Sequence, residues 1–438
     1  MAQIDSGTSA KIKIDQNENY TAALAVLASL FFIWAVVTNV NDILIPHLKK
    51  ALNLTDFQSS LVQSFFFGAY FVMSIPAGAI LKRVGYKWGI IIGLGLMFIG
   101  ALLFIPAALS RVYAVFLFAL FVVGSGITLL QVAANPYVAL LGNPNSASSR
   151  LNFTQAINSL GASIGPVLGG LLIFSGIEYS AAQWMALTPD QQLAYQVSEA
   201  KSVILPYVGL AVVLFLIALL IYYSNLPEIE SSEEEEVNHH LLNDRKTSVW
   251  QYSHLTFGTL AIFLYVGAEV AIGSFIIRFA KLPHIASLGE KEAAFYVGGY
   301  MFCAMIGRFL GAAILTKVNP RIWLGINALI AVGLLAFVIT GSGQAALWAI
   351  MSIGFFNSTM FPTIFTLGIK ELGRFTKEGS SFLIMAIVGG AVITPIMGLV
   401  SDAAGSIQVA FLIPLVCYLY IVFYGFVGSK VKNSTISN

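Results

Sequence analysis

The sequence predicts an all-α membrane protein with twelve transmembrane helices in two pseudo-symmetric halves of six. Three observations support this fold class: the composition, the spacing of long apolar runs and an internal repeat. Of the 438 residues, 58% are hydrophobic and only 10% are charged, whereas soluble domains contain about 25% charged residues. Because each crossing helix needs about 20 apolar residues and a connection, the length accommodates roughly a dozen spans and no large soluble domain.

Two sets of six apolar runs are separated by one polar segment. The first set covers residues 20–47, 57–81, 88–109, 112–141, 151–175 and 202–224. The second set covers residues 253–280, 293–316, 321–341, 344–369, 380–401 and 406–428. Each run is long enough to be a membrane helix. The expected domains are a cytoplasmic N-terminal tail (1–19), an N-terminal six-helix half (20–225), a cytoplasmic linker (226–252), a C-terminal six-helix half (253–428) and a cytoplasmic tail (429–438).

Matching motifs in the two sets indicate an internal repeat. A Gly-x4-Pro-x2-Gly pattern begins at Gly161 in the fifth run and again at Gly390 in the eleventh. The fourth run ends with Asn135–Gly142, and the tenth ends with the similar stretch Phe361–Gly368. A third match follows the second and eighth runs. Three matches in the same order indicate one duplicated six-helix unit.

The distribution of basic residues predicts the orientation. About fifteen Lys and Arg residues fall in segments on the side of the N-terminus, and about seven fall in the opposite loops. Positively charged loops favour the cytoplasm, so both termini and the linker are expected inside. The polar insert 177–201 in the opposite loop is expected to contain a short helix outside the membrane. The net charge of +2 is spread over loops and indicates no nucleic-acid partner.

Two acidic residues lie within apolar runs, where a charge costs about 2.5–3.5 kcal/mol on insertion scales. Asp42 in the first run is interpreted as a proton-handling or substrate-binding group; the alternative is a hydrated carboxylate near the helix end. Glu269 in the seventh run is interpreted as a second coupling group or a substrate-binding acceptor. Its alternative role is an ion pair with Arg278 or Arg308. For Arg308 itself, snorkelling or a structural ion pair is expected.

Amides and aromatic rings within the runs are candidates for binding a polyhydroxylated ligand. The amides are Asn39, Gln131, Asn135, Gln155, Asn158 and Asn357. The aromatic candidates are Trp34, Phe361 and Tyr265. A buried polar ligand needs matched donors and acceptors because an unpaired buried hydroxyl costs about 1–3 kcal/mol. The alternative role of each amide is to join two helices by hydrogen bonds. The alternative role of each ring is to pack against lipid or the core.

The sequence gives no sign of an enzyme. It contains no Ser/His/Asp or Cys/His set, no metal-ligand spacing and no Gly-rich phosphate loop. Cys303 and Cys417 lie in apolar runs and are expected to be small buried hydrophobic residues. No cofactor is therefore expected.

Motifs spread over nearly the whole chain carry a narrower resemblance. They are the stretches at 31–48, 133–142, 150–162, 265–275, 361–373 and 389–405. The chain resembles the major facilitator superfamily and, within it, the sugar–proton symporter family that includes the L-fucose–proton symporter and bacterial glucose/galactose transporters. The resemblance implies a site near the midplane between two halves that rock to give alternating access. It also implies that Asp42 is the protonatable group and that Trp34 is a site tryptophan.

Three positions depart from the fucose symporter pattern, and a fourth departs from the superfamily pattern. Gln131 replaces an acid in the fourth helix and cannot exchange a proton, so a two-acid relay cannot operate unchanged. Gly273 replaces a tryptophan, and Phe361 replaces a tyrosine, which argues against simple fucose specificity. Lys82 stands where the superfamily usually has aspartate, which puts the usual conformational latch in doubt.

The predicted function is import of a monosaccharide, a glucose- or galactose-like hexose, by proton symport across a bacterial inner membrane. The alternatives are sodium coupling, import of fucose or an amino sugar, and a transporter-like sugar sensor. The only partners expected are the sugar and the lipid bilayer, and the protein is expected to act as a monomer.

Overall fold

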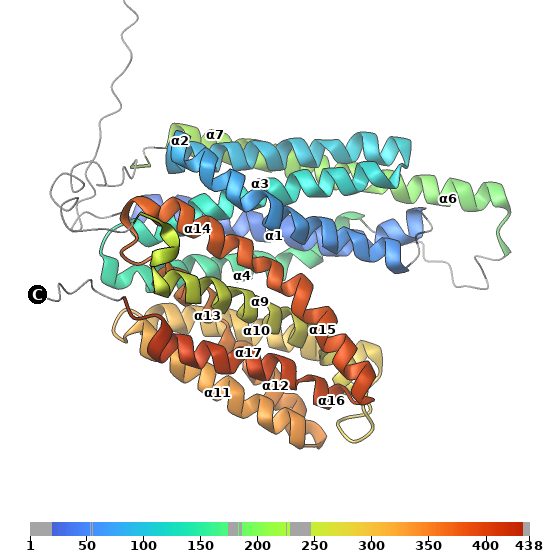
Figure 1. The fold of residues 1–438 in the computed structure, drawn as a ribbon. Helices are drawn as coiled ribbons and strands as arrows, with labels where there is room; N and C mark the ends of the chain where they lie inside the picture. The colour runs from blue at the N-terminus through green and yellow to red at the C-terminus, as the bar shows by residue number, and fades with distance from the viewer. Residues whose placement is uncertain are drawn as a thin grey trace, which may run out of the picture.

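The computed structural model describes residues 20–52, 54, 56–173, 183, 186–224, 226–227 and 247–431 of the chain. The helices of the N-terminal half are α1 (Thr21–Leu52), α2 (Asp56–Ser110), α3 (Tyr113–Leu140), α4 (Ala147–Ile173), α6 (Pro189–Ser202) and α7 (Ile204–Tyr223). The helices of the C-terminal half are α9 (Ser253–Ala280), α10 (Glu290–Ile314), α11 (Pro320–Thr340), α12 (Gly343–Asn357), α13 (Met360–Gly368), α14 (Thr376–Met385), α15 (Gly389–Ala404), α16 (Ile407–Ala410) and α17 (Leu412–Phe423). Figure 1 shows the two sets as separate bundles, coloured blue to green and yellow to red.

The described helices account for twelve membrane passes. Ten stretches are long and apolar enough to span a bilayer, and one of them, Ser64–Ser110, contains two passes. These two passes meet within α2 at Gly85, where φ is 78° and ψ is 177°. Glycine adopts this positive φ without a steric penalty, so the chain can reverse there. With α4 as the remaining pass, the predicted all-α architecture of two six-helix halves is confirmed.

Glycines allow equivalent helices to pack closely in the two halves. A Cβ atom on Gly161 of α4 would lie 2.4 Å from the carbonyl oxygen of Phe32 in α1. A Cβ atom on Gly389 of α15 would lie 2.0 Å from the carbonyl oxygen of Phe263 in α9. Neither approach leaves room for a side chain. Gly161 and Gly389, the residue before the repeated Gly390, therefore bring the first helix of each half against the fifth.

Three helices of the C-terminal half are interrupted where the sequence indicated continuous runs. The run 344–369 divides into α12 and α13 at Ser358–Thr359, the run 380–401 contains a 3₁₀ turn at Ala386–Val388, and the run 406–428 divides into α16 and α17 at Phe411. The first interruption is held by tertiary contact, because Arg308 Nε donates to the Ser358 carbonyl oxygen at 3.1 Å. A helix break that depends on a distant side chain leaves little trace in local hydrophobicity.

The polar insert contains the predicted short helix, α6 (Pro189–Ser202). Thr188 and Gln191 form a reciprocal capping box at its start, with backbone-to-side-chain distances of 3.3 and 3.0 Å. Such a box satisfies two of the free N–H groups at a helix start. Its first position is Pro189, which is well suited to that place.

The flanks of the linker define one end of the molecule, called here the linker end. Tyr137 of α3 donates its hydroxyl to the carbonyl oxygen of Pro227 at 2.5 Å. Lys87, in the second pass of α2, donates to the carbonyl oxygen of Ser224 at 2.8 Å. The linker end therefore contains the last turn of α3, the turn within α2 and the end of α7.

Candidate functional site

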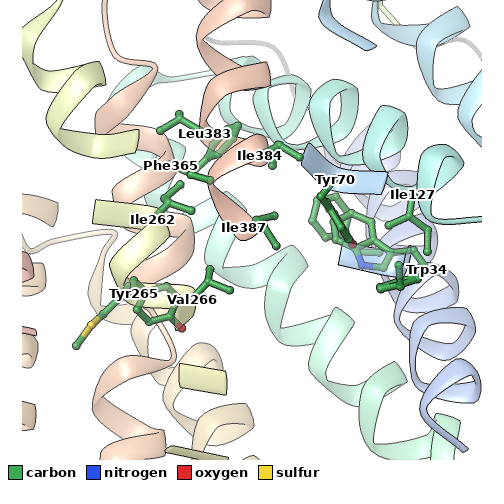
Figure 2. Packing of buried hydrophobic residues seen from close by; sticks show 14 of the residues in the cluster. Trp34, Tyr70, Ile127, Ile262, Tyr265, Val266, Phe365, Leu383, Ile384 and Ile387 are labelled. Carbon is green, nitrogen blue, oxygen red and sulfur yellow. The ribbon is translucent and has the colours of Figure 1, made fainter. Parts of the chain in front are cut away.

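The N-terminal half contributes an aromatic and amide cluster. Gln131 of α3 donates from Nε2 to the hydroxyl of Tyr70 on α2 at 2.9 Å, and both side chains are buried. Trp34 of α1 is 6% exposed and packs on Phe31 with ring centroids 4.4 Å apart. Trp34 and Tyr70 both belong to the buried cluster shown in Figure 2. Sequence reasoning missed Tyr70, whose only signal is a hydroxyl in an otherwise apolar run.

Two of the predicted amides lie together, on α3 and α4. Asn135 is fully buried, and Nε2 of Gln155 is 3.5 Å from its Oδ1 atom. The loop between these helices is fixed by Arg150, which donates to the carbonyl oxygens of Val138 and Ala139 at 3.2 and 2.7 Å. These bonds satisfy acceptors at the end of α3, one turn after Asn135.

The side-chain amide groups of Asn158 and Asn39 donate hydrogen bonds to the backbone of α1. Asn158 Nδ2 donates to the carbonyl oxygen of Phe31 at 2.8 Å and so joins α4 to α1. Asn39 Nδ2 donates to the carbonyl oxygen of Ala35 within α1 at 2.8 Å. The structure therefore contains the helix-joining contact that was the alternative role of Asn158, although each amide oxygen can still accept a bond from a ligand.

The C-terminal half contributes a second polar cluster around Asn357 at the end of α12. Its Nδ2 atom donates to the hydroxyl of Tyr300 on α10 at 2.6 Å and to that of Tyr418 on α17 at 3.0 Å. All three side chains are buried. Tyr300 and Tyr418 were not predicted, because their meeting depends on three helices that are distant in sequence. Phe361 lies at the start of α13 and stacks on Phe365, with centroids 6.2 Å apart.

Glu269 and Arg308 form an ion pair between α9 and α10. Oε1 of Glu269 lies 3.7 Å from Nη2 of Arg308, and the two side chains are 25% and 16% exposed. Arg308 was predicted either to snorkel or to form an ion pair, and the structure contains the ion pair. Arg278, the other proposed partner of Glu269, instead lies over the ring of Phe275 at 5.0 Å. Tyr265 precedes Glu269 by one turn, is fully buried and is seen beside Val266 in Figure 2.

The two clusters meet through Arg308. Its Nη1 atom donates to the hydroxyl of Ser159 on α4. Ser159 in turn donates to the backbone oxygen of Gln155 at 3.1 Å. The acid of the C-terminal half and the amides of the N-terminal half are therefore connected through one guanidinium group.

Two buried amide atoms in these clusters have no hydrogen-bond partner within the described part of the chain. They are Nδ2 of Asn135, a donor, and Oδ1 of Asn357, an acceptor. A buried polar atom without a partner costs about 1–3 kcal/mol, so such atoms are rare in native proteins and are suited to receive a ligand. A ligand hydroxyl can both donate and accept, and it would satisfy either atom.

The side chain of Asp42 lies outside the described residues. The backbone of α1 includes this position, while the stretch of α1 that is long and apolar enough to span a bilayer is Thr21–Asn39. Its role remains a prediction from the sequence.

The two halves are joined to each other near the linker end. Lys82 of α2 forms an ion pair with Glu378 of α14, with 2.6 Å between Nζ and Oε2. Hydrogen bonds between the halves accompany it, namely Ser380 to the Val132 oxygen (2.9 Å), Ser148 with Thr366 (2.6 Å) and Ser149 to the Ala312 oxygen (2.6 Å). Lys82, which departs from the usual aspartate, thus has an acidic partner on the opposite half.

Comparisons with known proteins agree with this architecture. The family model for the Major Facilitator Superfamily matches residues 25–378. The chain belongs to this superfamily of membrane transporters, and the prediction that it is not an enzyme is confirmed.

Within the superfamily, the chain is similar to sugar transporters over nearly its full length. It is 46% identical to a glucose/galactose transporter of Brucella abortus over 414 residues, which cover 94% of this chain and 95% of the relative. It is 40% identical to the L-fucose-proton symporter of Escherichia coli over 424 residues, which cover 97% and 96%. The crystal structure of that symporter in its outward conformation matches with a TM-score of 0.83 and 40% identity, covering 93% of this chain and 98% of the other. The predicted family is therefore confirmed.

Proposed function

We propose that this protein imports a monosaccharide, a glucose- or galactose-like hexose, by symport with protons. The relatives named above are sugar transporters, and one of them is a proton symporter. The observation that carries the proposal is the pair of unpartnered amide atoms, a donor on Asn135 and an acceptor on Asn357, one in each half. A sugar between the halves would bond to both atoms and so contact both moving parts of the transporter.

Aromatic rings supply the apolar part of the proposed site. Trp34 presents a large ring in the N-terminal half, and Phe361 lies at the start of α13 in the C-terminal half. The face of a hexose ring carries C–H groups that pack on an aromatic surface, while its edge carries hydroxyls for the amides. Phe361 has no hydroxyl where the fucose symporter pattern has a tyrosine, which argues against simple fucose specificity.

Sugar binding is expected to weaken when either amide is removed. Asn135→Ala and Asn357→Ala each take away one bond to the sugar, which corresponds to about 1–3 kcal/mol or roughly 5- to 150-fold in Kd. Calorimetry on the purified protein with glucose, galactose and fucose measures this. Asn327→Ala is the matched control, because Asn327 is a buried amide of α11 that bonds only to the Trp323 oxygen at 2.8 Å among the contacts of the described residues. Unchanged affinity in both test variants would contradict the proposed site.

Two acids are proposed to couple sugar movement to protons. Asp42 lies on α1 three residues after Asn39, so both are on one helix face. Glu269 lies in mid-helix on α9 and is ion-paired. A carboxylate with neighbouring amide oxygens also suits a hard cation, so sodium coupling is the second candidate. Fucose or an amino sugar is the second candidate for the substrate.

The proposed topology places both termini and the linker in the cytoplasm of a bacterium, with the protein in the inner membrane as a monomer. The domain limits are those given by the apolar runs: 20–225 and 253–428 for the halves and 226–252 for the linker. Because the halves are joined near the linker end, the structure is proposed to be an outward-facing state. Alternating access then requires the Lys82–Glu378 pair to separate.

A charge-swap experiment tests this latch. Lys82→Glu places two carboxylates together and is expected to open the linker end more often. An exposed ion pair contributes about 0.2–1 kcal/mol, so the effect is at most about fivefold. The readout is the labelling rate of a cysteine at Ser149, buried between the halves, by a membrane-impermeant maleimide after Cys303 and Cys417 are replaced. The double variant Lys82→Glu/Glu378→Lys should return the rate to normal; no rescue would contradict a direct ion-pair latch.

A further inference from the structure

Arg308 makes three contacts that together join an acid, a helix break and the opposite half. Nε donates to the Ser358 oxygen at 3.1 Å. Nη2 faces Oε1 of Glu269 at 3.7 Å. Nη1 donates to the hydroxyl of Ser159 on α4. The first two contacts lie within the C-terminal half, and only the third crosses to the N-terminal half.

The geometry of guanidinium makes these contacts interdependent. Its donors form a rigid planar fork, so fixing Nε on Ser358 and Nη2 on Glu269 also fixes the direction of Nη1. Without a negative charge on Glu269, the fork keeps one anchor in its own half. A positive charge that is only 16% exposed then has no counter-ion, and such a charge is costly away from water.

We propose that Arg308 is a positioning residue that transmits the charge of Glu269 to the contact between the halves. While Glu269 is ionised, Arg308 is held where it bonds to Ser159 and ties α10 to α4. When Glu269 gains a proton, the guanidinium turns away and this tie is released. The use of this tie in transport rests on the proposed proton coupling. Proton binding to Glu269 then lowers the barrier to the rocking of the two halves.

The groups facing Glu269 are consistent with this role. Arg308 and Tyr300 face it from α10, Tyr418 faces it from α17, and Tyr265 lies on the same helix. Among these groups Arg308 is the one cation, and no second carboxylate is among them. Arg308 is therefore the one counter-ion of Glu269 among these groups.

The test measures the distance between the halves without sugar or a membrane gradient. Spin labels at Asn145 and Lys317, exposed positions at the linker end of opposite halves, are introduced after Cys303 and Cys417 are replaced. In the wild type, the fraction of molecules whose halves are separated at the linker end is expected to be about tenfold higher in mildly acidic than in mildly alkaline buffer. This factor is the effect of losing one charge-assisted hydrogen bond. Glu269→Gln should show the acidic distribution in both buffers.

The variants distinguish a positioning role from a structural one. Ser159→Ala and Arg308→Gln should both lose the response to pH, and Arg308→Lys should lose it too, because an ammonium group lacks the fork. The matched controls are Ser163→Ala, one turn further along α4, and Arg321→Gln, whose arginine bonds to Ser429 and Phe426 in its own half. Both should respond like the wild type.

Two results would overturn the proposal: a full pH response in Ser159→Ala, or no response in the wild type. Ser159→Ala removes one hydroxyl, so normal elution on size exclusion separates a specific effect from misfolding. Because the assay contains no sugar, its result does not depend on whether the transport assignment holds. Failure of sugar uptake with an intact distance response would refute the proposed function and leave the role of Arg308 standing.

Discussion

Asp42→Asn is expected to abolish accumulation of sugar against its gradient while leaving sugar exchange down a gradient. The amide has nearly the shape of the carboxyl group, but it cannot take up and release a proton. Asp42 is one helix turn beyond Asn39 on α1, and that helix also carries Trp34.

The assay for Asp42 compares two modes of transport in proteoliposomes. Counterflow with labelled sugar on one side measures exchange, and an imposed proton gradient measures accumulation. Asp42→Glu is the matched control, because it keeps an ionisable group on the same helix face. Normal accumulation in Asp42→Asn would exclude this residue as the coupling acid.

Glu269→Gln is expected to have the second large effect. The substitution removes the partner of Arg308, which lies 3.7 Å away. Breaking one side of a buried ion pair costs about 3–5 kcal/mol, and the 25% exposure of Glu269 reduces that cost by solvent screening. The expected consequence for transport is impaired sugar binding or impaired proton coupling.

Separate measurements of binding and coupling identify the role of Glu269. If it carries a proton, sugar-driven proton uptake is lost while calorimetric affinity changes only a few-fold. If it is a sugar acceptor, the affinity falls by about tenfold or more, as for a charged hydrogen bond. Glu371→Gln is the control, since Glu371 is an exposed carboxylate that pairs with Lys370 at 3.6 Å. Unchanged binding and coupling in Glu269→Gln would remove this residue from the site.

Much of the fold was predictable because local runs of apolar residues indicate membrane helices. The run 253–280 coincides with α9, and the separation of two spans near residue 85 is seen as the turn at Gly85. The break at Ser358–Thr359 was not predicted, because it is held by Arg308 from another helix. Local sequence reports burial but does not report which distant side chain completes a helix end.

The site was predictable in its residue types and less so in its pairings. Asn135, Gln155 and Asn357 were expected as polar groups in apolar runs, and all three are buried there. The hydrogen bonds from Asn357 to Tyr300 and Tyr418 depend on how three helices meet. The same limit applied to Lys82, whose departure from the usual aspartate was evident although its partner on α14 was not.

The most direct test of the account is uptake into proteoliposomes with an imposed inside-alkaline proton gradient. Glucose, galactose, mannose, fucose and N-acetylglucosamine are compared, with and without a sodium gradient. The account predicts accumulation of a hexose, glucose or galactose, that collapses when a protonophore is added and does not depend on sodium. Accumulation that follows sodium would contradict proton coupling, and measurable sugar binding with no transport would indicate a sensor instead.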